Sequence, residues 1–392
     1  MSRIDELITE LCPNGVPVHR LGEIATMLRG NGMPKTMLLD AGVGAIHYGQ
    51  IYTKYGTWAE ETLSFVSDDD AKKLTKAEPG DLIITNTSEN LEDVGKAVAW
   101  LGESQIVTGG HATVIKHKFE PKFLAYWFQT PDFYMQKKKL ATGTKVIDVS
   151  AKKLEQVIIP VPPLEIQREI VRILDTFSKM EAELEAELEA RKQQYEHYRH
   201  STFETSESVP HVPLGNLTRI KTGSAVSKRA IEDNPGQYPV INSGREPLGF
   251  IGTFNTENDP IGVTSRGAGV GSITWCNEPY FRGNLNYAVT IRDQKTMVVR
   301  YLFHALNHLQ PEIQGLCTFQ GIPALNKSNL EKLLIPVPSI DEQQRIVGFL
   351  DQLDSFVNDL SIGLPAELVA RRQQYKYYRD KLLTFKELEP AV

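Results

Sequence analysis

The sequence has few cysteines, no long apolar run and no excess of basic charge. Its three cysteines, Cys12, Cys276 and Cys317, stand far apart, without a CxxC pair. That spacing excludes a disulfide framework and a cysteine zinc site, and it favours a reducing compartment. The most apolar runs, such as 157–164, fall well short of the ~20 residues that a membrane span needs. The N-terminus lacks the pattern of a signal peptide. We expect a cytoplasmic protein with no membrane contact and no metal site.

Basic charge is in slight deficit, with 43 Lys/Arg against 49 Asp/Glu and a net charge of −6 over 392 residues. The acidic excess lies in residues 164–208, which carry 6 basic and 11 acidic side chains. Residues 209–330 carry 11 basic and 8 acidic side chains, and residues 16–150 carry 15 and 16. A uniformly basic nucleic-acid binder is therefore excluded, whereas a locally basic one is not.

Catalytic motifs are also missing. The sequence contains neither a Walker A motif nor HExxH. Residues 277–280 (NEPY) resemble the Asn-Pro-Pro-Tyr of adenine-N6 methyltransferases, but Glu278 replaces the first proline and no convincing cofactor loop accompanies it. His111 follows two glycines without a serine or cysteine elbow. We therefore expect no catalytic residue and no bound cofactor in this chain.

What the sequence does contain is an internal duplication. Residues 159–175 (IPVPPLEIQREIVRILD) recur as residues 335–351 (IPVPSIDEQQRIVGFLD), a shift of 176 positions. Residues 186–199 recur as residues 366–379 at a shift of 180, so the second copy has four extra residues between the two blocks. The sequences that precede the shared blocks differ strongly. This pattern predicts a duplicated domain with shared ends and divergent middles.

Each shared block begins a long helix of about 38 residues. Prolines precede the first helix, and its apolar residues alternate at steps of four and three, which is the seam of a coiled coil. In the second copy, two steps of four at positions 360, 364 and 368 form a stutter, and Pro365 adds a kink or break. We predict that the two helices pair antiparallel. The predicted seam residues are Ile170, Leu174, Phe177, Leu184, Leu188, Tyr195, Ile346, Leu350, Leu353, Leu368 and Tyr375.

The divergent segments have the pattern of mixed α/β domains with short strands punctuated by glycine and asparagine. The overall fold class is therefore α+β, with two mixed α/β domains joined by the two long helices. The predicted strands are Leu82–Thr85, Ala97–Leu101, Thr113–His117, Pro260–Thr264, Ser272–Trp275 and Ala288–Arg292. The predicted short helices are Pro121–Phe128 and Val298–Leu309.

Loops of both divergent segments are rich in side chains that contact nucleic acid. Arg, Asn and Gln can read base edges, Ser, Thr and Lys reach phosphates, and neighbouring glycines let the backbone approach. The candidate residues in the first segment are Arg29, Asn31, Lys35, Tyr48, Gln50, Tyr52, Lys54, Asn86, Thr87 and Lys145. Those in the second segment are Lys221, Ser227, Lys228, Arg229, Asn242, Arg245, Arg266, Arg282, Asn284 and Gln320.

Two divergent domains, each followed by a shared IPVPxxxxQxxIVxxLD helix, resemble the specificity subunit of a type I restriction-modification enzyme. The opening ELCPNGVPVHRLGEI (10–24) is also similar to the start of a recognition domain in that family. The resemblance covers essentially the whole chain. It implies target recognition domains at 1–158 and 209–334, a central shared helix at 159–208 and a C-terminal shared helix at 335–392.

The resemblance further implies a role in host defence and DNA methylation. Each recognition domain would read one half of a bipartite site on double-stranded DNA. The helices would set the spacing and dock two modification (methyltransferase) subunits, which would carry the S-adenosylmethionine. Restriction (motor-nuclease) subunits would join that core.

Two other functions remain open from the residues. A self-contained adenine-N6 methyltransferase fused to recognition domains would need an intact cofactor loop and Asn-Pro-Pro-Tyr. A purely structural coiled-coil scaffold would not need Gly-Arg-Asn loops in two divergent domains.

Overall fold

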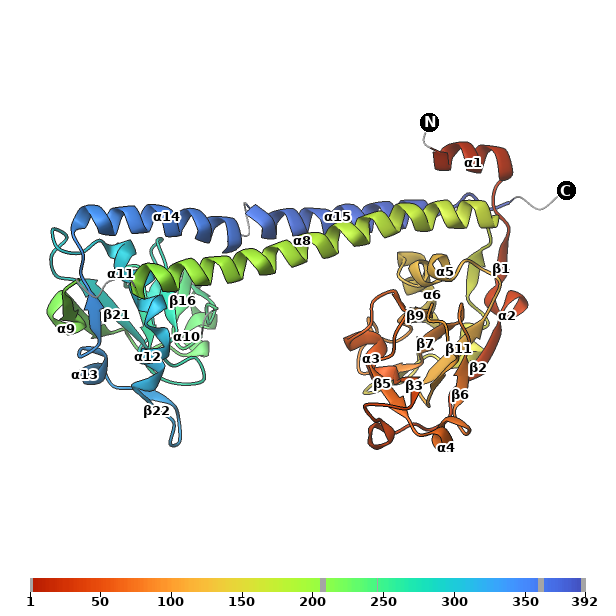
Figure 1. The fold of residues 1–392 in the computed structure, drawn as a ribbon, viewed down its shortest axis with the longest axis horizontal. Coiled ribbons are helices and arrows are strands. Elements are labelled where there is room, and N and C mark those ends of the chain that lie inside the picture. Colours follow the sequence, from red (N-terminus) through yellow and green to blue (C-terminus); the bar gives the residue numbers. More distant parts are fainter. Residues whose placement is uncertain (1–2, 205–208, 245, 359–362, 389–392) are drawn as a thin grey trace. The chain divides into compact units, whose positions relative to one another are not determined.

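The computed structural model describes residues 3–204, 209–244, 246–358 and 363–388 (Figure 1). The chain divides into two compact units. The first comprises residues 1–183 with 369–392, and the second comprises residues 184–368. Each unit therefore contains one divergent segment together with parts of the shared helices. The four-part division drawn from sequence similarity stays a prediction.

The first unit is built on two small mixed sheets. One has the strand order β2 (Thr26–Arg29), β11 (Ala112–Lys116), β7 (Leu82–Thr85), β9 (Ala97–Trp100), β4 (Trp58–Ala59). The other has the order β5 (Ser64–Val66), β3 (Val43–Ile46), β10 (Ile106–Thr108), β6 (Thr75–Ala77). The central strand β7 (LIIT) is apolar in its first three residues and is buried on both faces.

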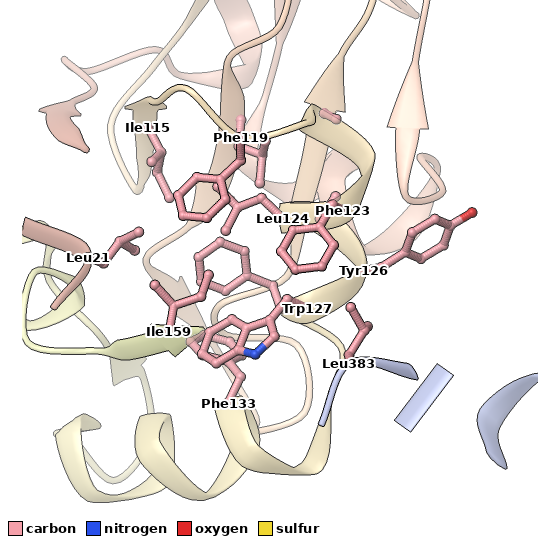
Figure 2. Packing of buried hydrophobic residues seen from close by; sticks show 14 of the residues in the cluster. Leu21, Ile115, Phe119, Phe123, Leu124, Tyr126, Trp127, Phe133, Ile159 and Leu383 are labelled. Carbon is pink, nitrogen blue, oxygen red and sulfur yellow. The ribbon is translucent and has the colours of Figure 1, made fainter. Parts of the chain in front are cut away.

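Two helices cover the first sheet of this unit. Helices α5 (Pro121–Trp127) and α6 (Pro131–Leu140) both begin with proline, and the side chains of Glu120 and Thr130 cap them. The apolar face of α5 is buried in the core (Figure 2). Ile159, from the strand before the long helix, and Leu383, which follows α15 (Gly363–Leu382), pack into the same core. The shared segments are thus part of the core of the first unit.

The second unit repeats this strand order. Its larger sheet runs β15 (Thr218–Thr222), β21 (Asn286–Ile291), β18 (Ile261–Thr264), β19 (Ile273–Trp275), matching β2-β11-β7-β9 of the first unit. Its smaller sheet runs β17 (Phe250–Ile251), β16 (Pro235–Ile241), β20 (Phe281–Arg282). Helices α11 (Val299–His308) and α12 (Gln310–Gly315) follow β21. The predicted duplication and the predicted strands and short helices are confirmed, with shifts of one or two residues at some ends.

In each unit a short strand pair leads into the shared helix. Strand β13 (Ile158–Pro160) pairs with β1 (Val18–Arg20), and β24 (Leu334–Pro336) pairs with β14 (His211–Pro213). Helix α8 (Leu164–Glu204) begins directly after the two prolines, as predicted, and α14 (Ile340–Asn358) follows β24.

The helices pair antiparallel within each unit. In the first, the ring of Phe177 stacks on that of Tyr378 at 5.4 Å between centroids, and Glu181 pairs with Arg372 at 2.7 Å. In the second, Tyr198 of α8 meets Phe349 of α14 at 5.5 Å. The predicted seam residues Ile170, Leu174, Tyr195, Ile346, Leu350 and Leu368 are buried, and Phe177, Leu184, Leu188, Leu353 and Tyr375 are half-buried. Leu360, at the predicted stutter, lies outside the described residues.

A buried glutamine attaches each divergent segment to its helix. In the first unit, the Oε1 of Gln167 accepts a hydrogen bond from the backbone N–H of Glu120 at 2.9 Å. In the second, the Oε1 of Gln343 accepts from the N–H of Val298 at 2.8 Å. The Nε2 of Gln343 donates to the carbonyl of Thr296 at 3.0 Å and to a proline carbonyl before α14 at 2.9 Å. The same residue of the repeated motif therefore binds the start of the equivalent helix, α5 or α11.

An aspartate two turns further along the helix forms a second attachment in the first unit. Asp175 accepts from the Nζ of Lys122 and from the hydroxyl of Tyr126, each at 2.8 Å. Both donors lie on α5, four residues apart, and therefore on one face of that helix. Lys122 also lies over the ring of Trp58, 3.9 Å from its centroid.

The second unit repeats this contact with different donors. Asp351 accepts from the Nε of Arg300 at 2.6 Å and from the Nε2 of His304 at 2.7 Å, and Asp354 takes the other side of the guanidinium at 3.1 Å. His304 is fully buried and its Nδ1 has no hydrogen-bond partner among the described residues. Burial lowers the pKa of His304, which the nearby Arg300 charge reinforces and the Asp351 hydrogen bond opposes. This imidazole is therefore held neutral.

Candidate nucleic-acid interface

The loops that carry the predicted DNA contacts of the second unit lie against one another. The N–H of Gly283 donates to the carbonyl of Ile241 at 2.7 Å, and the N–H of Leu285 donates to the Oδ1 of Asn242 at 2.9 Å. The carbonyl of Leu285 accepts from the N–H of Ser265, and the carbonyl of Ser265 accepts from the N–H of Leu325, both at 2.8 Å. Leu325 lies in the hairpin of β22 (Cys317–Thr318) and β23 (Ala324–Leu325). Four segments far apart in the sequence thus form one surface.

Glycine is required where two of these loops cross. A Cβ on Gly283 would lie 2.3 Å from the Oδ1 of Asn242, and one on Gly223 would lie 2.3 Å from the carbonyl of Arg282. A side chain at Gly223 would therefore collide with the neighbouring backbone, and one at Gly283 would displace the Asn242 side chain that joins the loops.

Several predicted contacts of this unit are exposed, and Asn242 supports the loop cluster from inside. Ser227 caps α10 (Lys228–Asp233), and Arg229 pairs with Asp233 at 3.6 Å. Asn242 is buried and holds the loops as described above. Arg245 lies outside the described residues. The exposed candidates are Lys221, Ser227, Lys228, Arg229, Arg266, Asn284 and Gln320.

Arg282 requires a correction, because the structure gives it a structural role. Its side chain is 2% exposed, and its guanidinium donates to the carbonyls of Asp259, Ile261 and Tyr287 and to the Oδ1 of Asn286, at 2.7 to 3.0 Å. A buried guanidinium whose two terminal nitrogens donate to the protein in this way cannot reach a base. The structure places Arg282 in β20, and the sequence around an arginine beside glycine does not reveal whether its side chain points outward or inward.

The first unit gathers its loops in the same way. Asn31 forms a bridge to Gly109, and its Nδ2 donates to the carbonyl of Lys73 at 2.9 Å. The N–H of Asn86 donates to the carbonyl of His111 at 2.7 Å, and the ring of His111 meets that of Tyr48 at 5.1 Å. The Nδ2 of Asn86 ties the cluster to the segment after α6 through the carbonyl of Val149 at 2.8 Å.

The predicted contacts of the first unit divide by exposure. Asn86 and Thr87 are buried supports of the loops. Gln50, on helix α3 (Tyr48–Thr53), is half-buried: its Oε1 accepts from the N–H of the N-cap residue His47, and its Nε2 donates to the hydroxyl of Ser64 in β5. Tyr48 and Tyr52 are half-buried as well. The exposed candidates are Arg29, Asn31, Lys35, Lys54 and Lys145.

His111 is a residue that the sequence analysis set aside and the structure places in this cluster. It is exposed and adopts a left-handed φ of 69°, which is uncommon for a residue other than glycine. Such a conformation persists only where surrounding contacts impose it, and it occurs preferentially at functional sites. Nothing in the sequence other than the two preceding glycines signals this geometry.

The chemistry of both clusters is that of recognition. They offer amide, hydroxyl, guanidinium and ammonium donors around close backbone approaches. Among the described residues, no three His, Cys, Asp or Glu side chains come together as a metal site would require. In those same ranges, no helix is long and apolar enough to cross a bilayer.

Known proteins resemble the chain in sequence and in fold. The family model for the type I restriction modification DNA specificity domain matches it twice, at residues 13–191 and 207–370. The type I restriction enzyme EcoR124I/EcoR124II specificity subunit of Escherichia coli is 31% identical over 298 residues, which cover 68% of this chain and 72% of that protein.

Two solved structures share the fold. The S subunit of a type I restriction-modification system from M. genitalium superposes with a TM-score of 0.58 at 17% identity, covering 94% of this chain and 96% of that one. A chain from a structure of type I R-M complex assembly and conformational transition gives 0.64 at 20% identity, covering 95% and 98%. With both copies of its duplicated unit matched, the chain belongs to the family of the type I restriction modification DNA specificity domain.

Proposed function

We propose that this chain is the DNA-specificity subunit of a type I restriction-modification complex and performs no chemistry itself. The observation that carries the proposal is the repeated unit. Two domains of the same strand order each present a cluster of glycine-crossed, donor-rich loops, while the sequences of those loops differ. Recognition of two different half-sites on double-stranded DNA requires two different recognition surfaces on one chain.

Under this proposal the shared helices have two further roles. They set the spacing between the half-sites, and they dock two modification subunits, which supply the S-adenosylmethionine and the methyl transfer. Restriction subunits join the same assembly. The near-neutral charge of the two recognition domains supports a need for partners, because phosphate neutralisation provides much of the affinity for DNA.

The alternative of a self-contained methyltransferase is not favoured. Tyr280, the last residue of the Asn-Pro-Pro-Tyr-like segment, is buried, and its hydroxyl donates to the carbonyl of Asp259 at 2.9 Å. It therefore supports the network around Arg282 and does not stand in an open pocket.

Domain exchange tests the proposal. The chain is expressed with its modification partners, and methylated adenines are mapped across the host genome before and after residues 209–334 are replaced by the equivalent segment of a related subunit. We expect one half of the methylated site to change and the other half to stay the same. Changes in both halves, or in neither, would contradict the assignment of one half-site to each unit.

A further inference from the structure

Both units carry a short hairpin of identical length after their covering helices. In the first unit, Thr142 and Asp148 exchange two backbone hydrogen bonds, at 2.9 and 2.7 Å. In the second, Thr318 of β22 pairs with Ala324 of β23. Each pair encloses five residues, and the two hairpins are 176 positions apart, which is the shift of the shared block that follows them. They are the same element of the duplicated fold.

The tips of these hairpins are apolar. Val146 is 57% exposed, and its counterpart at a shift of 176, Ile322, is 70% exposed. Phe319, on the same tip as Ile322, is 64% exposed. Phe319 and Ile322 are the most exposed large apolar side chains in the part of the chain that the structure describes. A single exposed apolar residue is ordinary, but exposed apolar residues at the same point of two otherwise divergent domains indicate a shared binding role.

The base of each hairpin is joined to the candidate DNA-contacting loops. In the first unit, Asp148 pairs with Thr87, and in the second, Arg266 pairs with Ala324. The N–H of Gly267 donates to the carbonyl of Pro323 at 2.9 Å. The tips therefore continue the surfaces that carry the exposed donors of each unit.

The charge of the tips suits a polyanion. Neither five-residue tip (GTKVI at 143–147 and FQGIP at 319–323) contains a carboxylate, and Lys145 stands next to Val146. Gln320 stands next to Phe319, and the exposed Arg266 lies at the base of that hairpin. An apolar tip flanked by basic and amide groups fits a DNA groove, where phosphates line the rim and apolar base surface lies within.

We propose that the hairpin tips press Val146 in one half-site, and Phe319 with Ile322 in the other, against the apolar surface of DNA bases. This inference rests on the proposed function. The surface met is either the methyl group of a thymine or the face of a base that the tip partly unstacks. In both cases the contact adds affinity without displacing a counterion, unlike a lysine that contacts phosphate.

The test uses the complex assembled with its modification subunits and a duplex that carries the mapped site, with affinity measured by fluorescence anisotropy at several salt concentrations. The variants are Val146→Ser and the double change Phe319→Ser with Ile322→Ser. Met135→Ser is the control, because Met135 is an apolar side chain on α6 that is 53% exposed. Ile322→Leu keeps an apolar tip and should keep the affinity.

We expect the serine variants to bind about tenfold more weakly, the loss expected for an apolar side chain that is partly buried on binding. Their salt dependence should match that of the unaltered complex, whereas Lys145→Ala should reduce the slope of log K against log salt by about one if that lysine contacts a phosphate. Two further measurements distinguish a methyl contact from an unstacked base. Replacing thymine by uracil removes the methyl group, and the fluorescence of 2-aminopurine placed within the half-site rises when a base is unstacked. A response in either assay that the serine variants abolish supports the proposal.

Two results would overturn it. Serine variants that bind DNA as Met135→Ser does would show that the tips do not touch bases. Serine variants that fail to assemble with the modification subunits, seen by size-exclusion chromatography, would make the tips a protein-docking surface instead. Failure of the unaltered complex to bind any specific duplex is a separate outcome, because it would refute the proposed function itself.

Discussion

The glutamine that joins each recognition domain to its helix should control the local stability of that joint. Replacing Gln343 by leucine keeps the volume roughly constant but removes three hydrogen bonds of 2.8 to 3.0 Å. It leaves the N–H of Val298 and the carbonyls of Thr296 and Pro338 without this partner, at part-buried positions. An unsatisfied buried group costs about 1–3 kcal/mol, and a part-buried group costs less, so we expect the loss of all three bonds to total about 3 kcal/mol locally.

Hydrogen–deuterium exchange followed by mass spectrometry measures this loss where it occurs. A local loss of about 3 kcal/mol corresponds to roughly hundredfold faster exchange, provided that exchange proceeds through local opening. The peptide that contains Val298 should show it in Gln343→Leu. The peptide that contains Glu120 should show a smaller effect in Gln167→Leu, because Gln167 makes one hydrogen bond to that segment and one to a proline carbonyl.

Gln344→Leu is the matched control, because Gln344 is the next residue of the same helix and is exposed. If exchange at Val298 rises no more in Gln343→Leu than in Gln344→Leu, the glutamine does not hold the joint. A rise of the same size in both units after a change in only one would also contradict the reasoning, since each glutamine is argued to act within its own unit.

Three further predictions concern His304, Arg282 and the length of α8. His304→Tyr, which copies the residue at the equivalent place in the first unit, should make the second unit less sensitive to acid. The buried imidazole has a lowered pKa, so the unfolded form takes up a proton first and the free energy of unfolding falls as the pH drops below about 6.5. Urea titrations at pH 7.5 and pH 5 measure this free energy, and an equal loss between the two pH values in both proteins would contradict the prediction. Arg282→Met should destabilise the second unit by about 3–5 kcal/mol, because carbonyls paired with a buried cation lose their donors. An unchanged thermal midpoint would contradict the structural role of Arg282. Inserting one Glu-Ala-Glu-Leu unit after Leu188 should lengthen the helix by about 6 Å and the unspecified gap in the methylated site by one to two base pairs, with both half-sites unchanged; an unchanged gap in an active complex would leave the helices as docking surfaces only.

The sequence by itself determined the plan of this protein. The sequence repeats the IPVP motif, and Gln167 and Asp175 recur as Gln343 and Asp351. The repeat can be recognised from sequence because residues that form the same contact in both units keep the same chemistry. The seam of α8 was equally visible, since a long helix buries a stripe of period 3.5 whatever it packs against. Strand β7 could be predicted because a fully buried strand is a short continuous apolar run.

Only the tertiary structure decided which polar side chains face outward. Arg282 and Arg266 both precede a glycine in the same domain, yet one is buried in a network of carbonyls and the other is exposed. The difference arises from partners such as Asp259 and Asn286, which sequence distance does not reveal. The left-handed backbone of His111 is likewise set by packing between loops. Local sequence specifies periodicity, whereas the direction of a loop side chain depends on which distant backbone lies beside it.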